Sequence, residues 1–214
     1  MTKPKVLIIC GPTATGKTKM ALALAEEFNG ELISADSRQV YIGNDLETGK
    51  DKDIIGNIKI WLLDVVKADE DFSVSQWRKL AHEAIKDILS RDKLPIVVGG
   101  SGLYIKALVQ NLPDVDIPQD EKLRNSNKSV SELFDYLKSI DLAKAESLNN
   151  SDRNNPRRLV RAIEIAQCPS PKLGEGLRVR YLQIGLTAPK QYLEEKIRKR
   201  VIKRGLDPSF VQKE

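Results

Sequence analysis

Cysteine and histidine are scarce in this sequence. Its 214 residues include two cysteines, Cys10 and Cys168, and a single histidine, His82. The cysteines lie far apart and form no CxxC pair, which excludes the common zinc-site patterns and makes reduced thiols the simplest interpretation. We expect His82 to serve packing or to lie on the surface.

Glycine, proline and long hydrophobic runs are limited as well. The 13 Gly and 10 Pro are too few for a collagen-like or low-complexity chain. The apolar run at residues 6–10 is far too short for a signal peptide or a membrane span. We therefore expect a cytoplasmic protein without a membrane segment.

The residues that are present indicate a globular protein. Hydrophobic residues make up 41% of the chain and charged residues 30%, and the length suits one or two domains with a sizeable core. The net charge of +5 favours a polyanionic partner, although many ordinary enzymes are equally basic.

Short apolar runs alternate with helical patterns along most of the chain. The runs predict buried strands at residues 6–10, 31–35, 60–65, 95–98 and 181–186. Helical spacing of apolar residues follows the first run and the third, so the pattern predicts an α/β fold with a parallel sheet. Ligands bind such a sheet beyond the carboxyl ends of its strands. We expect Trp61 and Trp77 in the core.

The composition and hydrophobic pattern of the sequence change at residue 113. A turn-rich entry leads into polar residues and one amphipathic helix that carries Leu133, Phe134, Leu137 and Ile140. We predict a P-loop α/β core at residues 1–112, a small helical insertion at 113–150, and the rest of the core with basic C-terminal helices at 151–214. A loop is expected at residues 168–176.

A phosphate-binding motif lies between the first strand and the first helix. It reads Gly11-Pro12-Thr13-Ala14-Thr15-Gly16-Lys17-Thr18, which matches G-x-x-x-x-G-K-[ST] in the strand-to-helix context of a P-loop. Backbone N–H groups, a helix N-terminus and Lys17 would hold a diphosphate or polyphosphate, and Thr18 would hold Mg²⁺. The alternative is a glycine-rich turn that binds nothing.

Asp36 follows the second strand and lies at the same edge of the predicted sheet. A carboxylate there can act as a general base toward an incoming nucleophile. The alternative is a helix N-cap, because Gln39 follows three residues later as in a capping box.

Two further strand ends carry candidate residues. Gly99, Gly100 and Gly102 surround Ser101 after the fourth strand and indicate contact with a ligand or, alternatively, a tight turn. Asp64 ends the third strand, as a metal-binding acid does in P-loop proteins, but capping of a turn explains it equally well.

Arginines form a stripe on one helix that is apolar on its other side. Arg157, Arg158 and Arg161 would present this stripe to RNA phosphates, and a solvated helix face is the alternative. The last helix extends the basic surface through Lys196, Arg198 and neighbouring lysines.

Three of these motifs, in this order and spacing, resemble the tRNA dimethylallyltransferases, also called tRNA isopentenyltransferases. They are GPTATGKT at residues 11–18, DSRQVY at 36–41 and GGSGLYIKAL at 99–108. Residues 48–50 and 155–164 fit the family pattern more loosely. The resemblance reaches to about Val201, while the insertion and the C-terminus are shorter than in the family. A minimal version, a fragment and a decayed copy all remain open.

The resemblance implies transfer of a dimethylallyl group from dimethylallyl diphosphate to tRNA. The acceptor is N6 of adenosine 37, next to the anticodon, in tRNAs that read codons beginning with U. Asp36 would remove the N6 proton, Thr13 would contact the bridging oxygen of the donor, and the P-loop with Mg²⁺ would bind its diphosphate. Lys190 stands where the family usually has an arginine for this diphosphate. A cytoplasmic monomer is expected.

The resemblance also implies a set of contacts with the anticodon stem-loop of tRNA. The modified base must leave the loop stack to reach the donor. The implied contact residues are Asp36, Ser37, Arg38, Gln39, Ser101, Arg124, Arg157, Arg158 and Arg161.

Three other functions stay open at the level of the residues alone. A P-loop kinase would use Lys17, Thr18 and Asp36 in the same way. A prenyltransferase acting on free adenine nucleotides would not need the arginine stripe, and a truncated tRNA-binding remnant would bind RNA without turnover.

Overall fold

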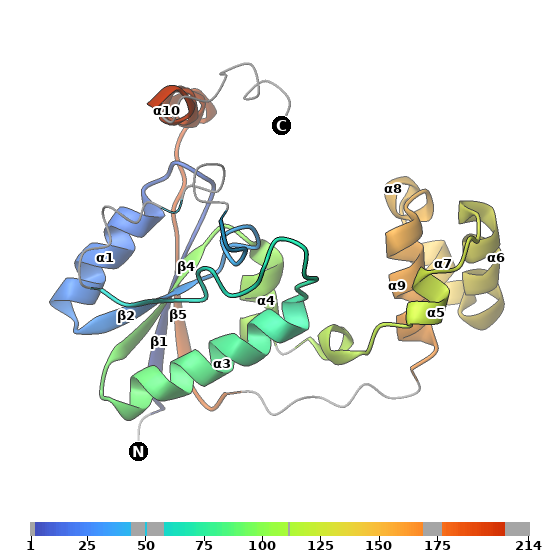
Figure 1. Cartoon of the computed structure of the whole chain (residues 1–214), viewed down its shortest axis with the longest axis horizontal. Helices are drawn as coiled ribbons and strands as arrows, with labels where there is room; N and C mark the ends of the chain where they lie inside the picture. Colours follow the sequence, from blue (N-terminus) through green and yellow to red (C-terminus); the bar gives the residue numbers. More distant parts are fainter. Residues whose placement is uncertain (1–2, 44–49, 51–57, 111, 169–176, 204–214) are drawn as a thin grey trace. The chain divides into compact units, whose positions relative to one another are not determined.

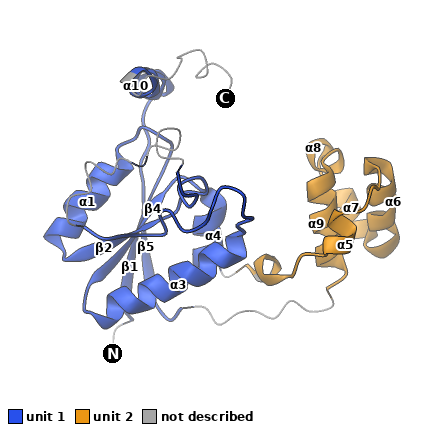
Figure 2. Ribbon diagram, in the orientation of Figure 1, with its two compact units in different colours: residues 1–110, 176–214 blue, residues 111–175 orange. Residues whose placement is uncertain are grey.

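The structure, a computed structural model, describes residues 3–43, 50, 58–110, 112–168 and 177–203. The chain forms two compact units (Figure 2). Unit 1 comprises residues 1–110 and 176–214, and unit 2 comprises residues 111–175.

Unit 1 is built on a five-stranded, all-parallel sheet with the order β3-β2-β4-β1-β5 (Figure 1). The strands are β1 (Lys5–Cys10), β2 (Gly30–Ser34), β3 (Ile60–Trp61), β4 (Leu94–Gly99) and β5 (Arg180–Gly185). All five predicted strands are present, which confirms the α/β, P-loop NTPase-like fold class.

Helices cover both faces of this sheet. They are α1 (Lys17–Glu27) on one face and α3 (Val74–Ser90) with α4 (Gly102–Gln110) on the other. A last helix, α10 (Lys190–Lys203), follows β5. Val6 and Ile8 point to the face covered by α3 and α4, while Leu7 and Ile9 point to the face covered by α1. Burial on both faces explains why β1 is a continuous apolar run.

Strand β3 is shorter than predicted. The sequence predicted a strand at residues 60–65, but pairing with β2 ends at Trp61. Leu62 and Asp64 adopt left-handed backbone angles, with φ of 65° and 53°, and such angles end a strand.

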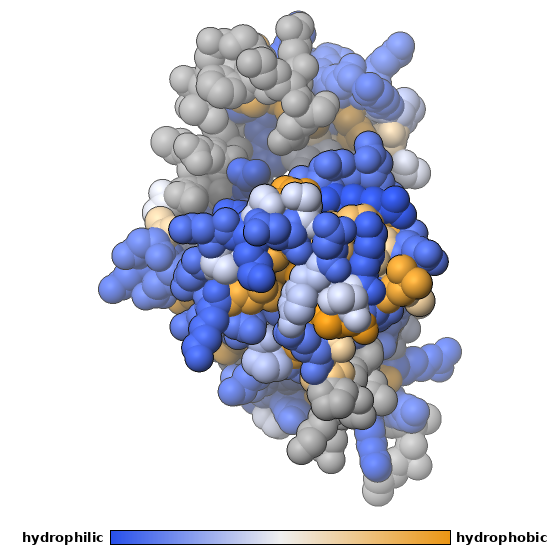
Figure 3. Space-filling view, turned by 90° about the vertical axis from the view of Figure 1, so that its right-hand side faces the viewer, coloured by the Kyte–Doolittle hydropathy of each residue, from blue (hydrophilic) through white to orange (hydrophobic). Residues whose placement is uncertain are grey.

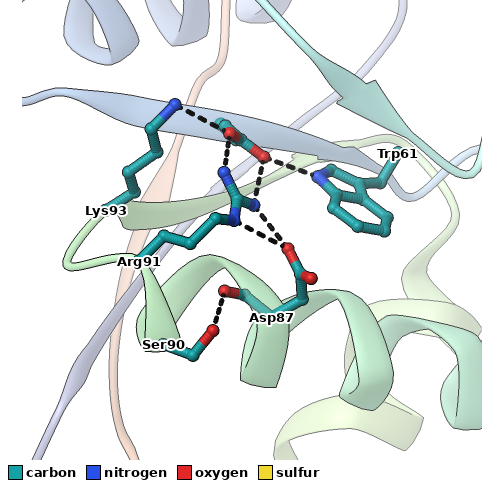
Figure 4. Close-up of polar contacts among 6 residues, drawn as sticks. Trp61, Asp87, Ser90, Arg91 and Lys93 are labelled. Atoms are coloured by element: carbon teal, nitrogen blue, oxygen red, sulfur yellow. Dashed lines mark hydrogen bonds and ion pairs between the residues drawn. The ribbon is translucent and has the colours of Figure 1, made fainter.

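A buried carboxylate near the amino end of β2 joins this strand to β3 and to the turn between α3 and β4 (Figure 4). Glu31 accepts hydrogen bonds from Arg91, from Lys93 at 2.9 Å and from the Trp61 indole at 2.9 Å. The Arg91 guanidinium, together with Lys93 and Trp61, holds the pKa of Glu31 well below its usual range. Trp77 is fully buried as expected, whereas Trp61 is half-buried.

Unit 2 is a small helical bundle with its own core. Its elements are the 3-10 turn η2 (Pro113–Asp116) and the helices α5 (Glu121–Arg124), α6 (Val130–Ile140), α7 (Leu142–Ser147), α8 (Asn150–Arg153) and α9 (Pro156–Ala166). Leu133 and Leu137 of α6 pack with Leu159 and Ile163 of α9.

The division by packing differs from the boundary at residue 150 drawn from the sequence. Helix α9 stays with residues 111–175, because its apolar face packs on α6. In this region the sequence predicted α6 and α9; α5, α7 and α8 are short helices that begin at side-chain caps, too brief for a periodic pattern.

Two smaller expectations concern thiols and membranes. Cys10 and Cys168 are both free thiols, as predicted. Within the described ranges, no helix is both long and apolar enough to cross a bilayer. The loop expected at residues 168–176 lies, apart from Cys168, outside the described residues.

Candidate active site

The P-loop curls tightly between β1 and α1. Gly11 has φ of 147°, and a Cβ there would lie 2.2 Å from the Leu186 carbonyl oxygen, so only glycine fits. Lys17 Nζ donates to the Pro12 carbonyl oxygen at 2.6 Å, which folds the lysine back over the loop. Burial lowers the pKa of Lys17, while the neighbouring Asp36 carboxylate opposes this shift.

A cavity of about 330 Å³ opens at the carboxyl ends of the strands in unit 1. The P-loop and the start of α1 line it with Thr13, Ala14, Gly16, Lys17, Thr18 and Lys19. Other lining residues are Ser34, Asp36, Gln39, Lys50, Ile60, Leu63, Val98, Gly99, Gly100, Lys196 and Arg200. The structure thus brings the two strongest sequence candidates, the P-loop and Asp36, to one cavity.

The lining of this cavity is strongly basic. Five of its side chains are cationic, and Asp36 is the one acid among its described lining residues. Such a cavity favours an anionic ligand, and the helix N-terminus of α1 adds to this preference.

Asp36 lies in a turn and not at the start of a helix. Residues 37–40 form turns, and Asp36 Oδ1 accepts a hydrogen bond from the Arg38 amide at 2.9 Å. Gln39 does not close a capping box, since its Oε1 accepts a hydrogen bond from Ser34 Oγ at 3.1 Å. The N-cap alternative is therefore wrong, and the half-buried carboxylate of Asp36 faces the cavity.

The Gly99–Ser101 segment packs directly against the turn that carries Asp36. Ser101 Oγ accepts a hydrogen bond from the Ser37 amide at 2.9 Å, and the Ser101 amide donates to the Ala35 carbonyl at 3.1 Å. A Cβ on Gly99 would lie 2.1 Å from the Ala35 carbonyl oxygen, so this glycine is required by packing of the backbone. Gly99 and Gly100 also line the cavity, whereas Gly102 begins α4 and does not line it.

Asp64 forms an ion pair. Its carboxylate lies 2.5 Å from Lys50 Nζ, and the Lys50 side chain is fully buried. Of the loosely matching 48–50 motif, Thr48 and Gly49 lie outside the described residues, while Lys50 lines the cavity.

The basic residues of α10 that line the cavity are not the one predicted to bind the diphosphate. Lys190 is 89% exposed and lies 3.7 Å from Glu194, and it does not line the cavity. Lys196 and Arg200, one helical turn apart, line it instead. The sequence-based prediction placed Lys196 on an outer surface and left Arg200 unassigned, although their i, i+4 spacing places both on one helix face.

Two of the predicted tRNA-contact arginines serve packing inside unit 2. Arg124 Nε and Arg161 each donate to the buried Glu164 carboxylate at 2.7 Å. Arg161 also donates to the carbonyls of Asp114 and Ile117. These bonds fasten the entry of unit 2 to α9.

Glu164 is the buried centre of this cluster and was not singled out from the sequence. Burial alone would raise the pKa of Glu164, but hydrogen bonds from Arg124 and Arg161 outweigh it and lower the pKa. The signal available in the sequence was an acid on the apolar side of an otherwise basic helix.

The remaining two arginines of the stripe lie on the surface. Arg157 is exposed, and Arg158 pairs with Asp152 while its side chain stays 55% exposed. One face of the chain, seen in Figure 3, is mainly hydrophilic and carries only separate hydrophobic groups. A surface of this kind suits a polar partner better than an apolar one.

The cavity lining includes oxygen donors for a metal ion, among them Thr18 and Asp36. Across the described segments, no group of three or more His, Cys, Asp or Glu residues could hold a metal. Mg²⁺ usually keeps several waters and binds through one or two protein groups plus substrate phosphates. The Thr18 hydroxyl beside the P-loop therefore fits Mg²⁺ that arrives with a phosphorylated ligand.

The fold and the cavity define a P-loop α/β protein with a basic ligand site and one carboxylate. The sequence profile of the IPP transferase family matches residues 39–206. This chain belongs to that family. The match begins at Gln39 and therefore does not include the P-loop or Asp36.

Curated relatives agree with this assignment. A tRNA dimethylallyltransferase of Anoxybacillus flavithermus is 41% identical over 207 residues, which cover 92% of this chain and 66% of that protein. A tRNA dimethylallyltransferase 2 of Treponema denticola is 39% identical over 211 residues, covering 94% and 70%. The chain spans about two thirds of the length of these relatives.

Solved structures are similar as well. The full-length tRNA isopentenylpyrophosphate transferase of Bacillus halodurans has a TM-score of 0.63 and 35% identity, covering 95% of this chain and 66% of that one. A eukaryotic dimethylallyltransferase described as acting on tRNA has a TM-score of 0.77 and 25% identity, covering 94% and 52%.

Proposed function

We propose that this protein transfers a dimethylallyl group from dimethylallyl diphosphate to N6 of an adenosine in tRNA. The observation that carries the proposal is the shared cavity of the P-loop and Asp36, which combines a site for a diphosphate leaving group with a base. The names of the relatives, and a structural neighbour described as acting on tRNA, support the same reaction.

The proposed reaction is a displacement at carbon. The adenine N6 attacks C1 of the dimethylallyl group, the C1–O bond breaks, and diphosphate leaves with the bonding electrons. Asp36 accepts the proton that N6 loses, and Thr13 contacts the bridging oxygen. Lys17 and the P-loop amides stabilise the charge that develops on the leaving group.

Other groups at the cavity complete the binding site for the donor. Mg²⁺, held through Thr18 and the donor's own oxygens, would supply Lewis-acid stabilisation of the diphosphate. Lys196 and Arg200 are better placed than Lys190 to add positive charge, because they line the cavity.

The finer part of the proposal concerns the tRNA. The modified base would be adenosine 37 of tRNAs that read codons beginning with U, presented by the anticodon stem-loop. Ser37, Arg38, Gln39 and Ser101 would contact the nucleotide, with Arg157 and Arg158 on the RNA backbone. The protein would act as a monomer in the cytoplasm.

The test uses radiolabelled dimethylallyl diphosphate, Mg²⁺ and unmodified tRNA. We expect label on tRNA with the wild-type protein, and a rate about 10²–10⁴ lower with Asp36→Asn, since the base is lost while its shape is kept. The matched control is Asp92→Asn, an exposed aspartate with φ of 52°, a conformation that asparagine tolerates equally well.

Parallel reactions with AMP or with ATP alone distinguish the alternative functions. Label on AMP would show that the protein prenylates free nucleotides, and ATP turnover without prenylation would identify a kinase. tRNA binding without any labelled product would identify an inactive remnant.

A further inference from the structure

Lys50 is a buried cation that neither the P-loop chemistry nor the base explains. We infer that Lys50 is a positioning residue, which holds the segment from Asp36 to Ile42 against the cavity through Asp64 and the Tyr41 carbonyl. The inference deepens the proposed function and rests on it for its catalytic consequence.

The contacts of Lys50 join two separate segments. Its Nζ donates to the Tyr41 carbonyl oxygen at 2.5 Å and to Asp64 Oδ1 at 2.5 Å. The Lys50 side chain is 0% exposed and that of Asp64 is 28% exposed. Removing one partner of such a pair leaves the other charge buried without compensation, which destabilises the structure around it.

The same two segments are joined by a short backbone ladder. The Asp64 amide donates to the Gln39 carbonyl at 3.2 Å, and the Val65 amide donates to Val40 at 2.7 Å. The Ile42 amide donates to Val66 at 2.8 Å. The ion pair therefore lies beside a ladder of only a few hydrogen bonds, so its loss should weaken the pairing of the two segments.

The chain beside this ladder is strained. Leu62, with φ of 65°, holds a left-handed angle that a bulky side chain rarely adopts and that persists only where the surroundings enforce it; Asp64 has a left-handed angle too, which aspartate tolerates. Leu63, between them, lines the cavity, as do Gln39 and Asp36. Lys50 therefore holds a part of the cavity wall that includes the turn carrying Asp36, the proposed base.

The first arm of the test measures hydrogen exchange and does not depend on activity. In Lys50→Met, the amides of residues 39–42 and 64–66 are expected to exchange at least tenfold faster than in the wild type. The control is Lys93→Met, which removes a lysine from the buried Glu31 near the amino end of β2 and should leave these amides unchanged. Equal exchange in the two variants would overturn the inference.

The second arm measures turnover. In Lys50→Met, kcat is expected to fall at least tenfold, while the Kd for inorganic diphosphate stays within twofold of the wild type. Lys50→Arg, which keeps the charge and the donors, should recover most of the loss. A diphosphate Kd that rises tenfold would show that Lys50 binds the ligand itself and would overturn the positioning role.

The outcomes separate this inference from the proposed function. If the wild type modifies no tRNA, the proposed function fails while the exchange arm still decides the role of Lys50. If the wild type is active and Lys50→Met matches Lys93→Met in kcat, the inference fails alone. Should Lys50→Met not fold, Asp64→Asn removes the same ion pair at its more exposed end and takes its place in both arms.

Discussion

A single hydroxyl group, that of Ser101, joins two motifs that lie 64 residues apart. By accepting a hydrogen bond from the Ser37 amide, it fixes the turn that follows Asp36. The sequence alone suggested contact with tRNA for this position; the structure adds an internal role that serine and threonine can both perform.

Replacement of Ser101 tests this role. Ser101→Ala removes an acceptor from the Ser37 amide, which should cost about 1 kcal/mol and lower kcat/KM for tRNA about fivefold to tenfold. Ser101→Thr keeps the hydroxyl and should retain most of the activity. Steady-state kinetics of the two variants provide the measurement, and an equal loss in both would contradict the role of the hydroxyl.

Gly99 and Gly102 form a matched pair for a stability measurement. A Cβ at Gly99 meets the Ala35 carbonyl oxygen at 2.1 Å, whereas one at Gly102 meets nothing within 4 Å. Gly99→Ala should therefore lose more than about 2 kcal/mol of unfolding free energy through strain. Gly102→Ala, at the start of α4, should change it by less than about 1 kcal/mol.

Urea denaturation of both variants gives the comparison. Similar midpoints for the two would mean that the close approach of β4 to β2 relaxes at little cost.

At the scale of elements, sequence patterns predicted the sheet better than the helical unit. Short apolar runs marked β1, β2 and β4 because burial on both faces leaves little room for polar residues, whereas β3 and β5 are less buried. The P-loop and Asp36 were predictable for a similar reason, since a strand end defines where each must lie.

The partners of charged residues could not be predicted. Arg161 and Arg157 occupy the same helix, yet one binds the buried Glu164 and the other is exposed. Spacing along a helix gives the face of a residue but not the element packed on it. Lys190 was selected by its place in the family pattern, which does not reveal that Lys196 and Arg200 line the cavity.

Glu164 stabilises the packing of helix α9, and this contribution to stability changes with pH. The pKa of Glu164 is lowered in the folded protein, so its contribution to stability is present above the ordinary value of about 4.3 and is lost as the pH falls below it. Glu164→Gln should destabilise the protein by about 1–3 kcal/mol at pH 7, and the difference from the wild type should shrink toward pH 3.

Urea midpoints at pH 7, 5 and 3 measure this effect. Glu83→Gln, at an exposed position of α3, is the control and should match the wild type throughout. A difference for Glu164→Gln that stays constant with pH would mean that its carboxylate charge does not stabilise α9.

At the scale of the whole molecule, the net charge of +5 suits a polyanion such as tRNA. Binding should weaken steeply with salt, because cations of the protein replace counterions on the RNA. Arg157→Ala should reduce the slope of log Kd against log salt by about 1, as expected for one lost phosphate contact.

Filter binding of tRNA between about 50 and 200 mM salt measures this slope. Lys86→Ala, which removes an exposed cation from α3 in unit 1, is the control and should leave the slope unchanged. Equal slopes for Arg157→Ala and the wild type would place Arg157 outside the RNA contact.

Trp77 gives the molecule a built-in optical reporter. Its indole donates to the Ser34 carbonyl at 3.0 Å and its ring stacks on Tyr104 at 4.6 Å, and Ser34 lines the cavity. The sequence contains only one other tryptophan, Trp61, which bonds to Glu31 near the amino end of β2. With Trp61 replaced by phenylalanine, the tryptophan fluorescence of the protein therefore comes from one residue directly behind the cavity wall, and ligand entry can be followed without any label.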